Sequence, residues 1–463
     1  MISTKNPRVI QGGMGFYIST PFLANEVSRL GGLGTVSGVA PERVMAIKLQ
    51  SGDVGGHFRE ALSHFPFPAI AQMVLDNFFI EEGNPRGLTK RGIPVFSIKP
   101  SRLLIALCVT ANFAFVWLSR QGHENPVSIN YLEKIALPHV YAIVGAMLGG
   151  VDYITMGAGI PLQIPALIDS VYEGRTVKYR IPVEGKNIKS YEMTFDPETF
   201  FGGKLPPMKK PRFLPIIASN LLASILVKKL PRGSIYGFVI EEPSAGGHNA
   251  QPRKGGAYGP KDEVDYAEIV KHGLPFWIGG SKASPEKLRW ALSIGAEGIQ
   301  VGTALALCEK SGMSPRWRTL VRKLGYRGTL RVKTDFTASP AGFPFKVGVI
   351  PNTLSETDIY TSRERSCAHG VLVTLFERSD GSIGCRCPGE PVEAYVHKGG
   401  AESDTVDRRC LCSGLIATTG LGNEDEAPII TLGDDITRLM PLLMRHEDDT
   451  YGVADVFKYL GVL

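Results

Sequence analysis

The sequence predicts an α/β fold, a (β/α)8 TIM barrel with inserted covers and a small C-terminal subdomain. Short apolar segments that end in glycine alternate with helical segments through the first 310 residues. These segments are continuously apolar, which is typical of parallel strands that are buried on both faces. Eight of them follow one another, which favours a closed barrel over an open sheet. The length of 463 residues suits a barrel of about 250 residues with additions.

Each expected strand is a short apolar run, and segments of good helix formers lie between the runs. The expected strands are Val9–Gln11, Gly34–Ser37, Val127–Asn130, Tyr153–Met156, Leu214–Ala218, Gly237–Glu241, Phe276–Ile278 and Gly298–Val301. The clearest expected helices are Pro21–Leu30, Pro138–Leu148, Asn220–Lys229 and Pro285–Ile294.

Two insertions interrupt the alternation of strands and helices. Residues 40–125 carry helices and strands of their own, and residues 172–212 are polar and aromatic. The alternation of side chains around Val177–Ile181 is typical of a hairpin strand. We expect both insertions to cover the barrel in part. The alternation stops near Trp317, so the chain divides into a barrel of residues 1–316 and a small cysteine-containing subdomain of residues 317–463.

The composition is that of a soluble globular protein, with 43% hydrophobic and 21% charged residues. The net charge is +6, but the basic residues are scattered and form no stripe, so we expect no nucleic-acid partner. The charge suits an anionic cofactor or substrate. No apolar run reaches the roughly 18 residues of a membrane span, and no N-terminal signal is visible. Seven late-clustered cysteines do not suggest a secreted disulfide framework, so we expect a cytoplasmic enzyme.

The first chemical motif is Gln11-Gly12-Gly13-Met14-Gly15, directly after the first expected strand. Glycines at the carboxyl end of a strand let the backbone lie flat against a planar ring, where a Cβ would collide. A glycine-rich turn of this kind also occurs without any ligand. The motif alone therefore leaves both interpretations open.

The second motif is Ser244-Ala245-Gly246-Gly247-His248-Asn249, just after the strand that ends at Glu241. It places an imidazole at the carboxyl rim of the barrel, where barrel enzymes have their active sites. The His248 side chain could donate a hydrogen bond or a proton to a carbonyl or nitro oxygen of a substrate. The alternative is a histidine that only satisfies backbone groups of its loop.

The third motif has two halves, Gly279-Gly280-Ser281 after the seventh strand and Gly302-Thr303 after the eighth. Barrels commonly bind phosphate with these two loops, whose free amides act together with the N-terminus of a following helix. Both halves occur here in the right order. A phosphate-bearing cofactor is therefore favoured over a purely structural role.

Together these motifs make the chain resemble the nitronate monooxygenase (2-nitropropane dioxygenase) superfamily, whose members bind FMN in a barrel. The resemblance spans residues 8–312. The residues that carry it are Gln11-Gly12-Gly13-Met14-Gly15, Gly31-Gly32-Leu33-Gly34, Ala245-Gly246-Gly247-His248 and Gly295-Ala296-Glu297-Gly298-Ile299-Gln300-Val301-Gly302-Thr303.

A narrower resemblance links nearly the whole chain to the trans-acting enoyl reductases of polyunsaturated fatty acid and polyketide synthases. Its segments are Gly52-Asp53-Val54-Gly55-Gly56-His57, Gly122-His123, Gly145-Ala146-Met147-Leu148, Met156-Gly157-Ala158-Gly159-Ile160-Pro161, Gly246-Gly247-His248-Asn249-Ala250, Ser339-Pro340-Ala341-Gly342-Phe343-Pro344-Phe345-Lys346 and Arg409-Cys410-Leu411-Cys412. The sequence departs from that pattern at Ser128, Ser413 and the Gly280-Ser281-Lys282 stretch. These departures bear on substrate choice more than on flavin binding.

The resemblance implies a set of site residues for bound FMN. The phosphate would lie on Gly279, Gly280, Gly302 and Thr303, the isoalloxazine against Gly12, Gly13, Met14, Met156, Gly157 and Ala158, and Gln72, Asn130, Gly246 and Gly247 would be further cofactor contacts. His248 would be the catalytic imidazole.

The resemblance also implies a reaction. NAD(P)H would reduce the flavin, flavin N5 would pass hydride to the β-carbon of an enoyl thioester, and His248 would polarise or protonate the other end. The substrate would be a small molecule or a carrier-protein-bound acyl group, with a fatty acid or polyketide synthase as partner. Two alternatives stay open: a nitronate monooxygenase that oxidises alkyl nitronates with O2, and a non-catalytic barrel subunit of a synthase. The choice between NADH and NADPH and the oligomeric state, a homo-oligomer included, are also open.

Five cysteines form a late cluster, namely Cys367, Cys385, Cys387, Cys410 and Cys412. Four thiolates could hold a structural zinc ion. Cys-x-Cys is not the usual zinc spacing, however, and buried free thiols or a redox pair are the alternative. We therefore assign no metal site from the sequence.

Overall fold

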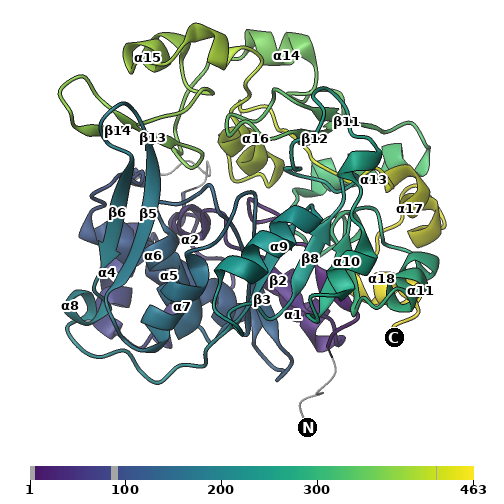
Figure 1. Cartoon of the computed structure of the whole chain (residues 1–463), viewed down its shortest axis with the longest axis horizontal. Helices are drawn as coiled ribbons and strands as arrows, with labels where there is room; N and C mark the ends of the chain where they lie inside the picture. Colours follow the sequence, from purple (N-terminus) through teal and green to yellow (C-terminus); the bar gives the residue numbers. More distant parts are fainter. Residues whose placement is uncertain (1–5, 85–91, 424) are drawn as a thin grey trace.

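The computed structural model describes residues 6–84, 92–423 and 425–463 (Figure 1). Eight parallel strands form its central sheet in the order β1-β10-β9-β8-β7-β4-β3-β2. The strands are β1 (Val9–Gln11), β2 (Gly34–Ser37), β3 (Val127–Leu132), β4 (Tyr153–Gly157), β7 (Arg212–Ile217), β8 (Phe238–Glu241), β9 (Phe276–Gly279) and β10 (Gly298–Val301). Ile10 pairs with Leu33 and so closes the sheet between β1 and β2. The predicted (β/α)8 barrel is confirmed.

An outer layer of helices surrounds the strands. These helices are α1 (Pro21–Arg29), α6 (His139–Leu148), α7 (Ile164–Tyr172), α9 (Asn220–Lys229), α10 (Tyr266–Val270), α11 (Pro285–Ser293), α12 (Thr303–Ala306) and α13 (Pro315–Tyr326). Several begin with a hydroxyl cap followed by proline, a combination that satisfies free amides and presets the first turn. Thr20 caps α1 by accepting a hydrogen bond from Leu23 N, and Ser284 caps α11 in the same way from Lys287 N.

The first insertion folds into four helices, α2 (Pro41–Gln50), α3 (His57–Ser63), α4 (Pro68–Phe78) and α5 (Arg102–Ser119). Helix α5 packs against α1 and α6. The insertion thus extends the outer helical layer beside the barrel and differs from the expected cover, because the apolar α5 is buried there. Helix α5 is long and apolar enough to cross a membrane, with a mean hydropathy of 1.7, but 78% of it is buried within the protein. Such burial is typical of a core helix.

The second insertion forms the expected hairpin, β5 (Val177–Glu184) and β6 (Ser190–Phe195), followed by α8 (Pro197–Phe201). Burial alternates along β5, as the sequence pattern predicts. The hairpin joins a strand from the far end of the chain: β13 (Thr374–Glu377) pairs in parallel with β5 and antiparallel with β14 (Ile383–Arg386). One four-stranded sheet therefore combines the insertion and the C-terminal subdomain (Figure 1).

The rest of the C-terminal subdomain crosses the mouth of the barrel and then returns to its side. Its other elements are β11 (Arg331–Asp335), β12 (Phe345–Val349), α14 (Thr357–Ser362), α15 (Val392–His397), α16 (Leu411–Thr418), α17 (Ile436–Leu443) and α18 (Val453–Leu460). Two short 3-10 turns, Pro260–Asp262 and Glu402–Thr405, complete the described elements. Helix α17 packs on α13, and α18 contacts α1 and α11.

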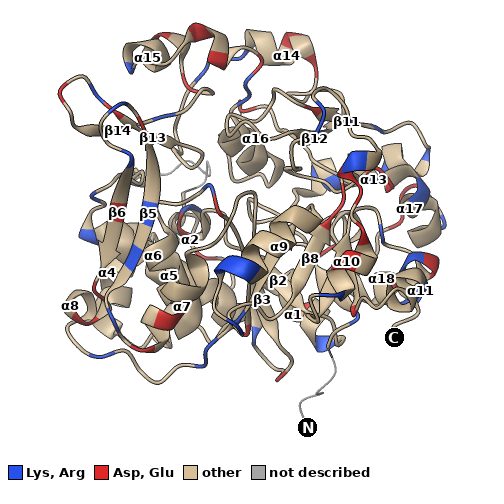
Figure 2. Cartoon of the chain, viewed as in Figure 1, with Lys and Arg blue, Asp and Glu red and all other residues tan. Residues whose placement is uncertain are grey.

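Side chains fill the barrel interior at the amino ends of the strands. A compact cluster of buried side chains occupies it: Ile10, Leu33, Tyr153, Leu214, Val239 and Trp277. The indole N–H of Trp277 donates a hydrogen bond to the carbonyl of Pro7 (2.7 Å). Because this end is packed, a ligand can enter only between the carboxyl ends of the strands. Charged residues of both signs are spread over many surface elements (Figure 2).

Candidate functional site

A cavity of about 1540 Å³, measured to its open mouth, lies at the carboxyl ends of the barrel strands. This volume includes the open space at the mouth of the cavity, so it is an upper bound on the room for a ligand. Most of the residues proposed from the sequence line it: Gly12, Gly13, Met14, Asn130, Gly157, Ala158, Gly246, Gly247, His248, Gly280, Gly302 and Thr303.

The loop after β1 presents bare backbone to this cavity. A Cβ on Gly12 would lie 3.3 Å from the Cα of Gly302, and a Cβ on Gly13 would lie 2.1 Å from the Cβ of Asn130. The Asn130 amide donates a hydrogen bond to the Gly13 carbonyl (3.4 Å), and its Oδ1 accepts one from the Thr155 hydroxyl (2.8 Å). The loop is therefore locked against β3 in a form that only glycine allows. A surface of this kind suits a flat aromatic ring.

The loops after β9 and β10 form a second bare surface. Gly280 has φ +98° and Ser281 φ +50°, so the loop after β9 turns sharply through left-handed backbone at the edge of the cavity. A Cβ on Gly280 would lie 2.9 Å from the Ser244 hydroxyl, whereas a Cβ on Gly302 would meet only the sulfur of Met14, at 3.9 Å. The space in front of Gly302 is thus open, and its shape and donor groups fit a phosphate.

The C-terminal subdomain completes this cradle. Gly433 N donates a hydrogen bond to the Thr303 hydroxyl (2.8 Å), and α17 begins directly after Asp435, so a helix N-terminus lies beside the cradle. Its dipole favours an anion there. Burial raises the pKa of Asp435, although Arg438 opposes the shift. The Asp435 Oδ2 atom lies 3.8 Å from Nη2 of Arg438 and, among the described residues, accepts no hydrogen bond.

His248 lies in the cavity wall, held on several sides. Its Nε2 atom is 2.8 Å from the hydroxyl of Ser339, and its ring meets Phe345 edge-on, with centroids 4.9 Å apart. Burial, together with a smaller effect of the nearby Lys134, lowers the pKa of His248 to about 4. The imidazole is therefore neutral at physiological pH. A neutral imidazole has one N–H and one nitrogen lone pair, which suits a role as hydrogen-bond donor to a substrate oxygen.

The backbone of the His248 loop is bonded to the C-terminal subdomain. Gly247 N donates to the Thr431 hydroxyl (2.7 Å), and Lys346 N donates to the Gly247 carbonyl (3.0 Å). The Lys346 ammonium in turn binds both carboxylate oxygens of Asp434, at 2.7 and 2.8 Å. The loop that carries the imidazole is thus fixed by residues that lie far away in the sequence.

Much of the remaining cavity wall is apolar, although Glu241 at the end of β8 and Lys282, Gln300 and Thr418 also line it. Burial raises the pKa of the Glu241 carboxyl to about 8, so it is largely protonated near neutral pH. Both parts of the chain contribute to the apolar wall, and the residues from the C-terminal subdomain include Phe345, Val371, Leu372, Leu415, Ile429 and Leu432. Such a wall suits an apolar substrate and excludes water.

Three of the residues proposed from the sequence do not line the cavity. Gln72 is exposed on α4 and donates to Asp76 (2.7 Å), because the polar face of that helix meets solvent. Met156 is fully buried in the core outside the barrel strands, since successive side chains of a strand point to opposite faces. Gly279 ends β9, and the cavity begins one residue later.

The residues that sequence reasoning missed are Ser339, Thr431 and Asp435 of the C-terminal subdomain, with Glu241 and Ser281 of the barrel. Glu241 ends a predicted strand and Ser281 follows one. Their position at the carboxyl end of a strand was the signal in the sequence that could have marked them. Ser339 lies in a segment that carries the resemblance to the enoyl reductases, whereas nothing in the local sequence marks Thr431 and Asp435, because their role arises from contacts across the mouth of the barrel.

The seven cysteines are free thiols. Cys108 and Cys308 are buried, as expected of core residues, and Cys387 and Cys412 of the late cluster are buried too. Among residues 6–84, 92–423 and 425–463, no group of three or more His, Cys, Asp or Glu side chains is arranged to hold a metal ion. The structure therefore gives the zinc interpretation no support.

No family model and no curated protein matches the chain. Among solved structures, it is similar to nitroalkane oxidase from Streptomyces ansochromogenes, with a TM-score of 0.50 and 10% identity over 98% of this chain and 94% of that one. FabK from Thermotoga maritima gives a TM-score of 0.48 and 14% identity over 98% and 92%. The enoyl reductase domain of MlnA, from the macrolactin biosynthesis cluster of Bacillus amyloliquefaciens, gives 0.48 and 9% over 99% and 94%.

The similarity to the nitroalkane oxidase structure runs over nearly the full length of both chains, the C-terminal subdomain included. By fold, this protein is therefore a (β/α)8 barrel that is similar over nearly its whole length to the nitroalkane oxidase structure.

Proposed function

We propose that this protein is an FMN-dependent oxidoreductase that reduces an enoyl thioester with NAD(P)H. The observation that carries the proposal is the cavity itself, in which a neutral, fixed imidazole shares one space with a side-chain-free surface and a phosphate-shaped cradle. Bound FMN would supply the hydride, taken from NAD(P)H and passed to the β-carbon of the enoyl group.

The residues of the chain would hold the cofactor at two places. The glycine surface at Gly12 and Gly13 would contact the flavin ring, and the loops at Gly280 and Gly302, together with Thr303, would hold its phosphate. Both surfaces fit because a Cβ is excluded at Gly13 and the space before Gly302 is open.

The chemistry of the chain itself centres on His248. Because much of the cavity wall is apolar, a ring N–H of the neutral imidazole can donate a hydrogen bond to the carbonyl oxygen of an enoyl thioester and stabilise the negative charge that develops there. A positioned donor of this kind contributes roughly 10²–10⁴-fold to a rate. The apolar wall would exclude water from the reacting atoms.

A second cavity supports an extended, acyl-type substrate. It measures about 1010 Å³ and shares Ile135 and Val371 with the first, so the two adjoin. Its wall is largely apolar, with Phe96, Leu137 and Leu375 among the lining residues. An acyl chain or the arm of a carrier protein would extend into it from the thioester. The partner would then be a fatty acid or polyketide synthase, with reduction in the cytoplasm.

The test is anaerobic flavin spectroscopy on the purified protein. We expect a yellow protein whose flavin bands bleach on addition of NADPH or NADH and return on addition of crotonyl thioester. Bleaching by an alkyl nitronate, with no reaction toward nicotinamides, would instead identify a nitronate monooxygenase. A colourless protein that takes up no FMN would favour a non-catalytic barrel.

His248→Ala provides the matched control for this experiment. Bleaching by NAD(P)H should persist in the variant, because the imidazole is not needed for flavin reduction. Return of the bands with crotonyl thioester should slow by about 10²–10⁴-fold. Equal rates in the variant and the wild type would contradict the role of His248.

A further inference from the structure

The bond between His248 and Ser339 joins the barrel to the C-terminal subdomain at the reacting end of the cavity. Ser339 is fully buried, and its hydroxyl lies 2.8 Å from His248 Nε2, across 91 residues of sequence. The Ser339 hydroxyl also accepts a hydrogen bond from Ala341 N (3.2 Å). Phe343 and Phe345 close on the imidazole edge-on from the same segment.

The hydrogen bonds of the Ser339 hydroxyl bear on which ring nitrogen of His248 carries the proton. A serine hydroxyl has one hydrogen to donate and two lone pairs. One lone pair is used by Ala341 N–H, and within the described residues the acceptor in reach of the hydroxyl hydrogen is His248 Nε2. In the arrangement that uses the hydroxyl hydrogen, Nε2 carries the lone pair and the ring proton sits on Nδ1. No described residue forms a hydrogen bond with Nδ1, so that N–H remains for a molecule in the cavity.

We propose that Ser339 is a positioning residue that fixes His248 in its Nδ1–H tautomer and aims this proton donor at the substrate. The inference deepens the proposed function, on which it rests for the identity of the substrate. The C-terminal subdomain would then set the protonation geometry of the site, in addition to closing the cavity.

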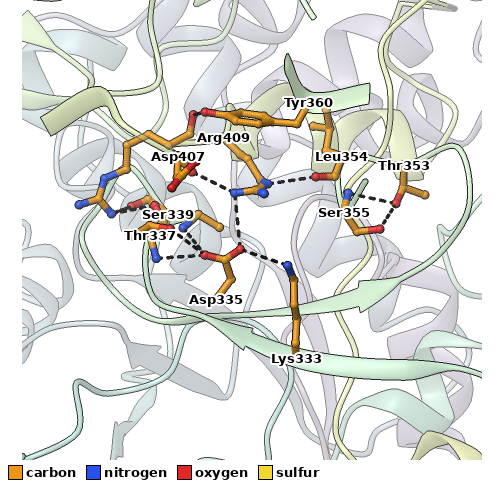
Figure 3. Close-up of polar contacts among 12 residues, drawn as sticks. Lys333, Asp335, Thr337, Ser339, Thr353, Leu354, Ser355, Tyr360, Asp407 and Arg409 are labelled. Atoms are coloured by element: carbon orange, nitrogen blue, oxygen red, sulfur yellow. Dashed lines mark hydrogen bonds and ion pairs between the residues drawn. The ribbon is translucent and has the colours of Figure 1, made fainter. Parts of the chain in front are cut away.

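The structure holds Ser339 in place by a network of charged groups (Figure 3). Asp335 accepts hydrogen bonds from Thr337 N (3.0 Å) and Ala338 N (2.9 Å), which fixes the turn just before Ser339. Arg409 lies 3.5 Å from Asp335 and its backbone N–H donates to the Ala338 carbonyl (2.9 Å).

The turn is held from two further sides. The Arg408 guanidinium donates to the Ser339 carbonyl (2.8 Å). From the barrel, the Lys134 ammonium donates to the Ala341 carbonyl (2.7 Å) and lies over the Phe343 ring, 3.7 Å from its centroid. A hydroxyl that only filled space would not need such restraint on its backbone, whereas one that orients an imidazole does.

The direct test is heteronuclear NMR of the oxidised, FMN-loaded protein grown with nitrogen-labelled histidine, which distinguishes the two tautomers by their ring nitrogen shifts. The His248 signals are assigned by their loss in H248Q. We expect Nδ1–H in the wild type and a shift to Nε2–H, or to a mixture, in Ser339→Ala. The matched control is Ser355→Ala, which removes another buried hydroxyl of the same subdomain that does not contact His248.

The kinetic test measures the same variants with NAD(P)H and an enoyl thioester. In Ser339→Ala we expect kcat to fall by about 10- to 100-fold, since orientation accounts for part of the effect of a positioned donor, with the KM for the thioester and the bleaching by NAD(P)H little changed. Ser339→Thr, which keeps the hydroxyl, should recover part of the rate. Ser355→Ala should leave kcat within about twofold of the wild type.

Each outcome bears on the proposal. An Nε2–H tautomer in the wild type, or an unchanged Nδ1–H tautomer in Ser339→Ala, would overturn it, and the wild-type spectrum decides even if the variant does not fold. If the wild type reduces no enoyl thioester, the proposed function fails. The NMR experiment still tests the His248 tautomer, because it needs no substrate. Loss of NAD(P)H bleaching together with kcat would indicate a general structural role for Ser339 and would also overturn the proposal.

Discussion

At the scale of single residues, the site depends on positions where one added atom changes what can bind. The backbone at Gly13 runs so close to Asn130 that the two residues share one space. On the other side of the cavity, the Asp435 carboxyl lies within the cradle that suits a phosphate. A substitution at either position is therefore expected to change the affinity for FMN.

Gly13→Ala should weaken flavin binding. The new Cβ would lie 2.1 Å from the Asn130 Cβ, so the loop after β1 must move. Overpacking of this kind costs about 1–3 kcal/mol, which corresponds to roughly a 5- to 150-fold loss of FMN affinity if the strain falls on the bound state. Fluorescence titration with FMN measures it. Gly203→Ala is the matched control, because its Cβ would meet nothing within 4 Å, and a similar loss there would contradict the argument.

Asp435→Asn should strengthen FMN binding. An ionised carboxyl beside the cradle repels a phosphate, and asparagine removes that charge at nearly constant shape. We expect about a tenfold gain in affinity, equal to ~1.4 kcal/mol. Because burial raises the pKa of Asp435, the carboxyl ionises as the pH rises, and the gain should grow with pH.

Riboflavin, which lacks the phosphate, is the matched ligand for the Asp435 comparison. Its affinity should be the same in both proteins. A weaker binding of FMN to Asp435→Asn would mean that the neutral carboxyl donates a hydrogen bond to the phosphate.

At the scale of elements, the turn between β11 and β12 is the part of the C-terminal subdomain that reaches the imidazole. It is stabilised by Arg409, whose guanidinium also donates to the Leu354 carbonyl (3.0 Å) and lies over the Tyr360 ring. Burial opposes the ionisation of Asp335, but Arg409 and the two backbone N–H groups outweigh it and hold its pKa below the usual range. The pair therefore acts as a charged support for the turn.

Arg409→Met should destabilise this region by about 2–4 kcal/mol, because it removes the nearer and more buried cation from the largely buried Asp335 carboxylate and leaves Lys333, at 3.8 Å. Hydrogen exchange should show faster opening of β11, β12 and α16 while the barrel strands stay protected. The control is Arg289→Met, which removes an exposed partner of Glu286 and should cost less than about 0.5 kcal/mol. Equal effects of the two substitutions would refute the supporting role of Arg409.

The elements also show what could be predicted from the sequence. All eight barrel strands were recognisable, with ends that differ from the observed ones by at most two residues, because continuous apolar runs ending in glycine have few other structures open to them. The positions of Gly12, His248 and Gly302 followed, since strand ends of a parallel barrel meet on one side. The resemblance to a known superfamily supplied the hypothesis of an FMN cofactor.

The remaining site residues could not be predicted because no local pattern specifies them. Thr431 meets Gly247 across 184 residues, and Asp435 reaches the cradle only because α17 folds back against α13. Gln72 was wrong as a cavity residue for the opposite reason, since its polar side chain belongs to the solvent face of an amphipathic helix. Long-range packing, which composition does not encode, decides both cases.

At the scale of the whole molecule, burial of neutral histidines links stability to pH. Burial lowers the pKa of His139, His248 and His369 to about 4. The unfolded chain binds protons at these groups near the usual histidine pKa of about 6.5, whereas the folded protein does so only near 4. Each histidine therefore reduces stability as the pH falls from about 6.5 toward 4. Burial raises the pKa of Glu241 to about 8, so the folded protein binds this proton first. This carboxyl therefore increases stability as the pH falls through about 8.

His139→Gln isolates one of these contributions, because His139 lies outside the cavity. Its Nε2 is 3.2 Å from the Leu132 carbonyl, a bond that a glutamine amide could retain. The free energy of unfolding of the variant relative to the wild type should increase by about 2 kcal/mol between about pH 7.5 and about pH 5. Urea unfolding at the two pH values measures it. A constant difference would show that His139 protonates equally in both states.

The long path of the C-terminal subdomain has a consequence for the order of events during synthesis. The ribosome releases the barrel strands first, and domains can begin to fold as they emerge. The glycine surface and the His248 loop then exist before Ser339, Thr431 and Asp435 have been made. The cavity of a nascent barrel would thus be open to solvent until the C-terminal subdomain folds across its mouth. Cofactor capture and the final alignment of the imidazole would therefore belong to the last moments of translation or to the time after release.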